Sequence, residues 1–174
     1  MKRIAVALCL LASAAVSAVA AQQGFKSIKE FLTGYEEVPA VSTSANAQFD
    51  ARISKDGSEI VWELSYSALE GSITQSHIHV GNAGTNGGVS AFLCTNLGNG
   101  PAGTQLCPTG PATISGTITA VDVIGPAGQG VAAGELDELI AAMRVGATYV
   151  NIHSTTWPGG EVRSQIDGNN SHNH

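Results

Sequence analysis

The sequence predicts an all-β domain of mainly antiparallel strands with one short helix. The chain is rich in Gly, Thr, Ser and Val and poor in Lys, a composition that suits a loop-rich β protein. Apolar and polar residues alternate in several short runs, and turn residues separate these runs. Only one stretch, at about 134–145, has the period of an amphipathic helix.

The first half of the chain predicts an edge strand followed by a hairpin. Ser27–Val38 is expected to form the edge strand, which ends in a turn at Pro39. Residues 46–54 and 60–66 alternate as two strands with one buried face. The turn between them, 55–58, contains Asp-Gly, which supplies the positive φ that a tight hairpin needs.

The second half predicts further strands around a glycine-rich loop and the helix. The loop, Gly81–Gly88, is too rich in glycine for regular structure. The expected strands are 76–80, 89–95, 112–123, 148–154 and 161–166. In the helix, Leu136, Leu139, Ile140 and Met143 form one apolar stripe, which we interpret as core packing.

The two ends of the chain are expected to lie outside the fold. Residues 1–20 resemble a secretory signal peptide, with a basic start, an apolar run over 4–16 and an A-x-A site at 18–20. We therefore predict a periplasmic or secreted protein with one domain over 27–167. Residues 168–174 are polar and are predicted to be disordered.

The charge of the processed chain excludes two classes of partner. The full sequence has 8 basic and 14 acidic residues, and removal of Lys2 and Arg3 brings the net charge from −6 to about −8. A chain of this charge is not expected to bind nucleic acid or an anionic membrane surface. No later apolar run is long enough to cross a bilayer, so we predict no membrane contact after processing.

Two cysteines, Cys94 and Cys107, remain after processing and are predicted to form a disulfide. The segment between them is rich in Gly, Asn and Pro, and a bridge would hold it in place. A redox or metal-binding role for the two thiols is the alternative.

Three histidines carry the functional prediction. His77 and His79 lie two apart on one predicted strand, so their side chains share a face. Asn151 and His153 likewise share the polar face of a second strand. If the apolar sides of both strands face one core, the imidazoles converge and match a copper or zinc site in ligand type. His172 and His174, in the tail, are interpreted as adventitious ligands at most.

The neighbours of these histidines suggest a wider site. Glu161 is expected to lie across the last hairpin from His153, either as a fourth ligand or as an acceptor for an imidazole N–H. Asn151 and Arg163 are placed around the ligands, and Arg163 is expected to pair with a carboxylate. Calcium is disfavoured because the Gly81–Gly88 loop contains no carboxylate. No nucleophile motif or phosphate-binding loop is present, so catalysis is not favoured.

The motifs resemble the CHRD domain, a family named after chordin and common in exported bacterial proteins. The resemblance rests on residues 76–81, 146–154 and 158–166, with support from Gly34–Pro39 and the helix. It implies a Greek-key β-sandwich or barrel with a short helix. It implies little chemistry, because the family is better defined as a domain than as an activity.

The arrangement is also distantly similar to copper-zinc superoxide dismutase, which has a His-x-His strand. That enzyme uses six histidines and an aspartate for two metals, so this chain could copy a mononuclear site at most. Two alternatives to plain metal binding stay open. One is a module that binds an extracellular protein or a glycan through the loops Gly81–Gly88 and Gly98–Gly110. The other is an enzyme that uses the metal for oxygen or superoxide chemistry.

Overall fold

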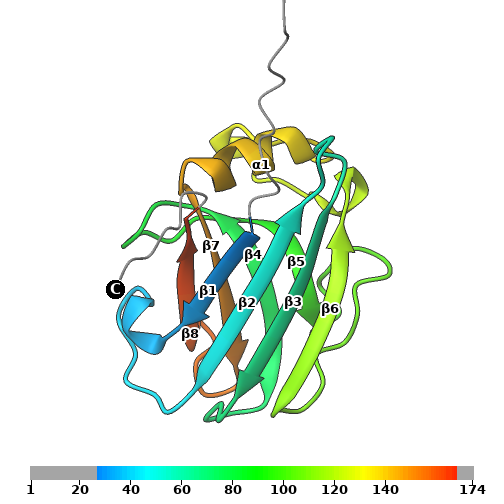
Figure 1. Cartoon of the computed structure of the whole chain (residues 1–174). Coiled ribbons are helices and arrows are strands. Elements are labelled where there is room, and N and C mark those ends of the chain that lie inside the picture. Colours follow the sequence, from blue (N-terminus) through cyan, green and yellow to red (C-terminus); the bar gives the residue numbers. More distant parts are fainter. Residues whose placement is uncertain (1–26, 168–174) are drawn as a thin grey trace, which may run out of the picture.

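Eight strands pack as two antiparallel sheets in the computed structural model, which describes residues 27–167 (Figure 1). The first sheet has the order β1-β2-β3-β6 and contains β1 (Ser27–Leu32), β2 (Asn46–Ile53), β3 (Ile60–Ser67) and β6 (Ala112–Ile118). The second has the order β5-β4-β7-β8 and contains β4 (Ile73–Val80), β5 (Gly88–Thr95), β7 (Thr148–Ser154) and β8 (Val162–Ile166). The predicted all-β class is confirmed. The predicted signal peptide and tail lie outside the described residues.

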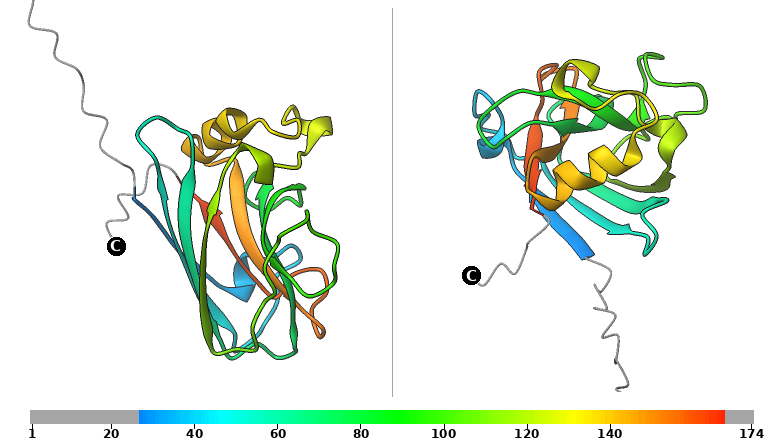
Figure 2. Two further views of the ribbon diagram at one scale, coloured as in Figure 1. Left: turned by 90° about the vertical axis from the view of Figure 1, so that its right-hand side faces the viewer. Right: turned by 90° about the horizontal axis from the view of Figure 1, so that it is seen from above.

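The core lies between the sheets, where alternate residues of each strand meet. Phe49 and Leu64 from the first sheet and Val150 and Ile152 from the second are fully buried. The helix α1 (Leu136–Arg144) lies across one end of the sandwich (Figures 1 and 2). All four residues of its apolar stripe are buried, which confirms the predicted core-packing role. Among the described helices, none is long and apolar enough to cross a membrane.

Two predicted strands are shorter than expected, because side chains cap short helical turns at their ends. β1 stops at Leu32, and Thr33 then accepts a hydrogen bond from the backbone N–H of Tyr35 to start a 3₁₀ turn, Gly34–Glu36. β6 stops at Ile118, and the Asp122 carboxylate accepts from the backbone N–H and the hydroxyl of Thr119. Ala120–Asp122 is therefore a second 3₁₀ turn, and Val121, expected in the strand, is 85% exposed.

The first strand also joins the two sheets at one side of the sandwich. Thr33 and Arg163 exchange two backbone hydrogen bonds of 3.1 Å, so the end of β1 lies beside β8. The segment after β1 is thereby brought next to the second sheet (Figure 1). This contact places Glu37 near the side chains of β7 and β8.

The predicted disulfide between Cys94 and Cys107 is present. It connects β5 to the long loop before β6, and both half-cystines are buried. Asn96 ties the same loop to β4, because its amide donates to the carbonyls of Ile73 and Cys107 and accepts from the Cys107 N–H.

Removal of this bridge is expected to destabilise the fold without unfolding it. The cysteines are 13 residues apart, and in the chain-entropy model a loop of this length is worth about 3 kcal/mol. We expect the Cys94→Ala/Cys107→Ala double variant to lose about that much in urea denaturation. An unchanged midpoint would show that the Asn96 contacts alone hold the loop.

Candidate metal centre

The pairing of β4 with β7 brings the histidines to one face of the second sheet. His77 lies opposite Asn151, and His79 lies opposite Tyr149. His153, two residues after Asn151, lies on the same face. Ile78, which alternates with the two β4 histidines, points into the core. The strand period therefore separates imidazoles from apolar side chains, as the sequence predicted.

The three imidazole rings lie close together. One ring nitrogen from each of His77, His79 and His153 lies within 4.8 Å of the other two, so the group could hold a metal ion. The centre of the His77 ring is 5.3 Å from that of His79 and 5.1 Å from that of His153. The exposed fractions of the three residues are 2%, 7% and 7%. The convergence predicted from the two strand motifs is confirmed.

Two of the rings are oriented by backbone carbonyls. Nδ1 of His79 is 3.0 Å from the carbonyl oxygen of Gly87, and Nδ1 of His153 is 3.0 Å from that of Pro158. A carbonyl oxygen only accepts, so each Nδ1 carries the proton and each Nε2 keeps its lone pair. A hydrogen bond to the second ring nitrogen is how proteins fix metal-binding histidines.

His77 has no hydrogen-bond partner in the described part of the protein. Both of its ring nitrogens are buried and unpaired, as is Nε2 of His79. The ring packs edge-on against Phe92, with ring centres 4.4 Å apart. A buried polar atom without a partner costs roughly 1–3 kcal/mol. This strain at a fixed position is typical of a functional site.

Burial keeps all three rings neutral near pH 7. It lowers the pKa of His77 to about 2, with a further lowering from His153 and His79. It lowers the pKa of His79 to about 4, although the Gly87 carbonyl acts in the opposite direction. The pKa of His153 is also lowered by burial. Neutral imidazole is the form that binds metals, so the site is competent at neutral pH.

Comparison with known families covers nearly all of the described residues. The family model of the CHRD domain matches residues 29–166. The chain belongs to the CHRD family. No curated protein and no solved structure matches it. The site of this CHRD domain is therefore interpreted from its own residues.

Asn151 and Arg163 both lie beside the imidazoles. Oδ1 of Asn151 is 3.2 Å from Nε2 of His153. Arg163 is buried, and its guanidinium carbon lies 3.6 Å from the centre of the Tyr149 ring. That ring stacks on His79, with ring centres 4.6 Å apart. Against expectation, Arg163 makes no ion pair within the described residues, because its guanidinium donates to the carbonyls of Thr85 and Asn82.

Glu161 does not join the three histidines. The β7–β8 ladder pairs Asn151 with Arg163 and Ile152 with Val162, so one further step would set His153 opposite Glu161. The ladder ends before that step, at Val162. The carboxylate instead accepts from the Thr43 hydroxyl and from the backbone N–H of Glu70. Neither contact involves His153, and the role expected for Glu161 stays a prediction, since strand pairing fixes side-chain positions only as far as the ladder extends.

Glu37 is the residue that sequence reasoning missed. Its side chain is buried, and its carboxylate lies against Gly160, where a Cβ would meet Oε1 at 2.5 Å. Burial raises the pKa of Glu37 to about 7, while Arg163, the Val38 backbone and the Asn151 side chain act to lower it. Glu37 belongs to the Gly34–Pro39 motif of the family resemblance, which was the only signal in the sequence.

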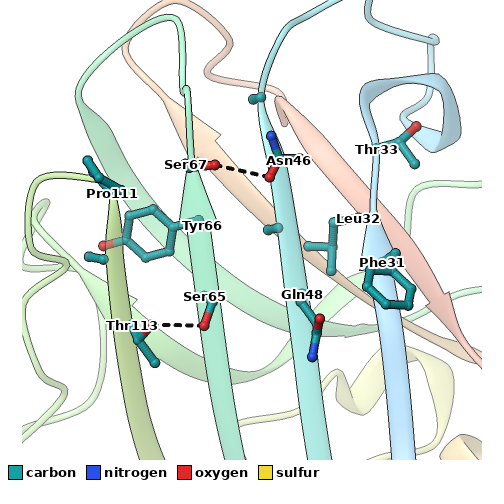
Figure 3. Close-up of a pocket in the computed structure, with 13 residues that line it drawn as sticks. Phe31, Leu32, Thr33, Asn46, Gln48, Ser65, Tyr66, Ser67, Pro111 and Thr113 are labelled. Carbon is teal, nitrogen blue, oxygen red and sulfur yellow. Dashed lines mark hydrogen bonds between the residues drawn. The ribbon is translucent and has the colours of Figure 1, made fainter.

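A groove of about 750 Å³ lies on the other sheet (Figure 3). Its rim carries hydroxyl and amide side chains that bond to one another, Ser65 with Thr113 and Ser67 with Asn46. These polar groups are satisfied within the protein. The ring nitrogens of His77 and Nε2 of His79 have no such partner among the described residues, so the histidine group is the stronger candidate site.

Proposed function

We propose that this CHRD domain binds one transition-metal ion, copper or zinc, through His77, His79 and His153. The observation that carries the proposal is the convergence of three buried, neutral imidazoles, of which two are oriented by carbonyls and present Nε2 to the group. Three imidazoles are a ligand set typical of zinc and copper proteins. The ligand nitrogens, which lie within 4.8 Å of one another, would have to approach to about 3.4 Å to share one tetrahedral ion.

We propose that the protein is located in the periplasm or the extracellular space. The Cys94–Cys107 disulfide supports this, because such bridges persist in oxidising compartments. The predicted signal peptide at residues 1–20 supports it as well. Removal of the predicted signal peptide is tested by determining the N-terminal sequence of the exported protein.

Metal content of the purified protein tests the proposal. We expect one zinc or copper ion per chain in a background in which His172→Ala and His174→Ala remove the tail histidines. The His77→Phe variant should bind no ion. Its fold should be preserved, because an apolar ring replaces two unpaired buried nitrogens beside Phe92, a change worth roughly 1–3 kcal/mol of added stability. Binding that survives His77→Phe would contradict the proposal.

The interaction module remains a sequence-based prediction. Its loop Gly81–Gly88 lies close to the histidine group, since the Gly87 carbonyl accepts from His79 and Arg163 donates to Asn82 and Thr85. Binding of a protein or glycan that persists in a chelator and in His77→Phe would favour this function over metal binding.

A further inference from the structure

The Asn151 side chain lies next to the three imidazoles. It is 2% exposed and lies opposite His77 across the β4–β7 ladder. Oδ1 is 3.2 Å from Nε2 of His153. Asn151 therefore lies beside the imidazoles of His77 and His153, on the same face of the sheet.

The contact between Asn151 and His153 is unfavourable without a cation. The Pro158 carbonyl holds the proton of His153 on Nδ1, so Nε2 of the neutral ring has only a lone pair to offer. Oδ1 of an amide is also an acceptor. Two buried acceptors thus face each other at 3.2 Å, an arrangement that a positive ion between them would stabilise.

Glu37 is the neighbour that can set the orientation of the amide. Its buried carboxyl lies near the Asn151 side chain. In its ionised form a carboxylate only accepts, so it favours the N–H₂ end of the amide on its side and Oδ1 towards the imidazoles. A reversal of the amide would place Oδ1 against the carboxylate of Glu37.

The separation of the two atoms fits joint coordination. Metal–nitrogen and metal–oxygen bonds of about 2.0–2.2 Å in a tetrahedral site set the ligand atoms about 3.4 Å apart. The observed 3.2 Å between Nε2 and Oδ1 is close to this value. Three imidazole nitrogens and one amide oxygen complete a four-coordinate site.

We infer that Asn151 is the fourth ligand of the metal centre, that Glu37 positions its Oδ1, and that the resulting site of three nitrogens and one oxygen takes a divalent ion such as Zn²⁺. The inference rests on the proposed function. An amide oxygen is a hard ligand that suits a divalent ion better than Cu⁺. Cu⁺ can also be held by the three imidazoles alone.

Affinities for Zn²⁺ and Cu⁺, measured separately in the background without tail histidines, test the inference. We expect Asn151→Leu to weaken Zn²⁺ binding by at least about tenfold and Cu⁺ binding by less than about threefold. Asn151→Asp keeps an oxygen at the same place and adds charge, and its second oxygen can share a proton with the Glu37 carboxyl, so it should bind Zn²⁺ at least as tightly as the parent. Asn46→Leu, on the other sheet, is the matched control and should change neither affinity.

Co²⁺ supplies a readout that a purely structural role would not move. The parent and Asn151→Asp should give the intense visible bands of a four-coordinate ion, with band positions that differ between the two. Glu37→Leu should weaken Zn²⁺ binding about as Asn151→Leu does, and Glu37→Gln, whose amide oxygen can still accept, should restore it.

The outcomes separate the inference from the proposed function. Zn²⁺ binding that needs His77 but is unchanged in Asn151→Leu overturns the inference and leaves the three-histidine site standing. Weaker Zn²⁺ binding by Asn151→Asp than by the parent also overturns it. A parent protein that binds neither Zn²⁺ nor Cu⁺ overturns the proposed function itself.

Discussion

Metal-free protein is expected to lose on the order of 4 kcal/mol of stability between about pH 6.5 and pH 4. The folded pKa values of His77 and His79 are about 2 and about 4, below the ordinary value of 6.5. In this window the unfolded chain therefore binds protons that the folded protein does not, and the free energy of unfolding falls as the pH falls. His153 acts in the same direction, because its pKa is also lowered.

Glu37 opposes this trend. Its folded pKa is raised to about 7 from 4.5, so the folded protein binds the extra proton between these values. Its contribution to stability is fully present at low pH and is lost as the pH rises through this range. Below about pH 6.5 the unfolded chain binds more protons at the histidines than the folded protein does, and the extra proton on Glu37 in the folded protein offsets roughly one of them. The net loss of stability is therefore smaller than the three histidines alone would give.

Urea denaturation in a chelator at several pH values measures the effect. His77→Phe should reduce the slope of the free energy of unfolding against pH by up to about 1.4 kcal/mol per pH unit, because the unfolded variant has one histidine fewer to protonate. Glu37→Gln should make the slope steeper, because the opposing titration is removed. An identical pH dependence in parent and His77→Phe would show that His77 titrates normally in the folded protein.

The strands, the helix and the histidine convergence follow from local patterns in the sequence. His77 and His79 are two residues apart, and Ile78 between them is apolar, which is enough to assign them to one face away from the core. The helix stripe is equally local. Such features are predictable because each depends only on neighbours within a few residues.

The predictions that differ from the structure concern residues at the end of a strand or just beyond the pairing of two strands. The position of Glu161 was extrapolated from a strand pairing that stops one residue before it. β1 and β6 were extended through Thr33 and Thr119, whose hydrogen bonds start 3₁₀ turns. The period-two pattern alone does not show where backbone hydrogen bonds are replaced by side-chain ones.

Glu37 was missed for a different reason. It follows β1 in the chain, while the histidines lie on β4 and β7 of the other sheet. Long-range contacts such as the Thr33–Arg163 bridge, between residues 130 positions apart, bring its segment to the site. Long-range contacts of this kind have no periodic signature in the sequence.

Replacement of Arg163 by methionine is expected to cost roughly 1.5–3 kcal/mol, the range for loss of a hydrogen bond from a charged donor. The side chain is 1% exposed, and its guanidinium makes hydrogen bonds of 2.8 Å and 3.3 Å to the carbonyls of Thr85 and Asn82. Methionine has similar bulk but offers no donor, so the Thr85 carbonyl loses its partner, while the Asn82 carbonyl keeps the N–H and the hydroxyl of Thr85.

The same substitution should also weaken metal binding at the histidine group. The loop that Arg163 holds ends at Gly87, whose carbonyl orients His79. Loss of the guanidinium frees that loop and removes the cation stacked on Tyr149, so Zn²⁺ affinity should fall roughly 10–100-fold, the range for residues that orient ligands. Urea denaturation gives the stability, and hydrogen exchange of the amides over 81–87 reports the loop.

Arg163→Lys separates charge from geometry. Lysine keeps the positive charge near Glu37 but cannot donate to both carbonyls in the planar fork of arginine. We expect a stability between those of the parent and Arg163→Met, with faster exchange in the loop than in the parent. A lysine variant equal to the parent would show that charge alone is needed. A methionine variant equal to the parent would show that Tyr149, which accepts from the Gly87 N–H, holds the loop without Arg163.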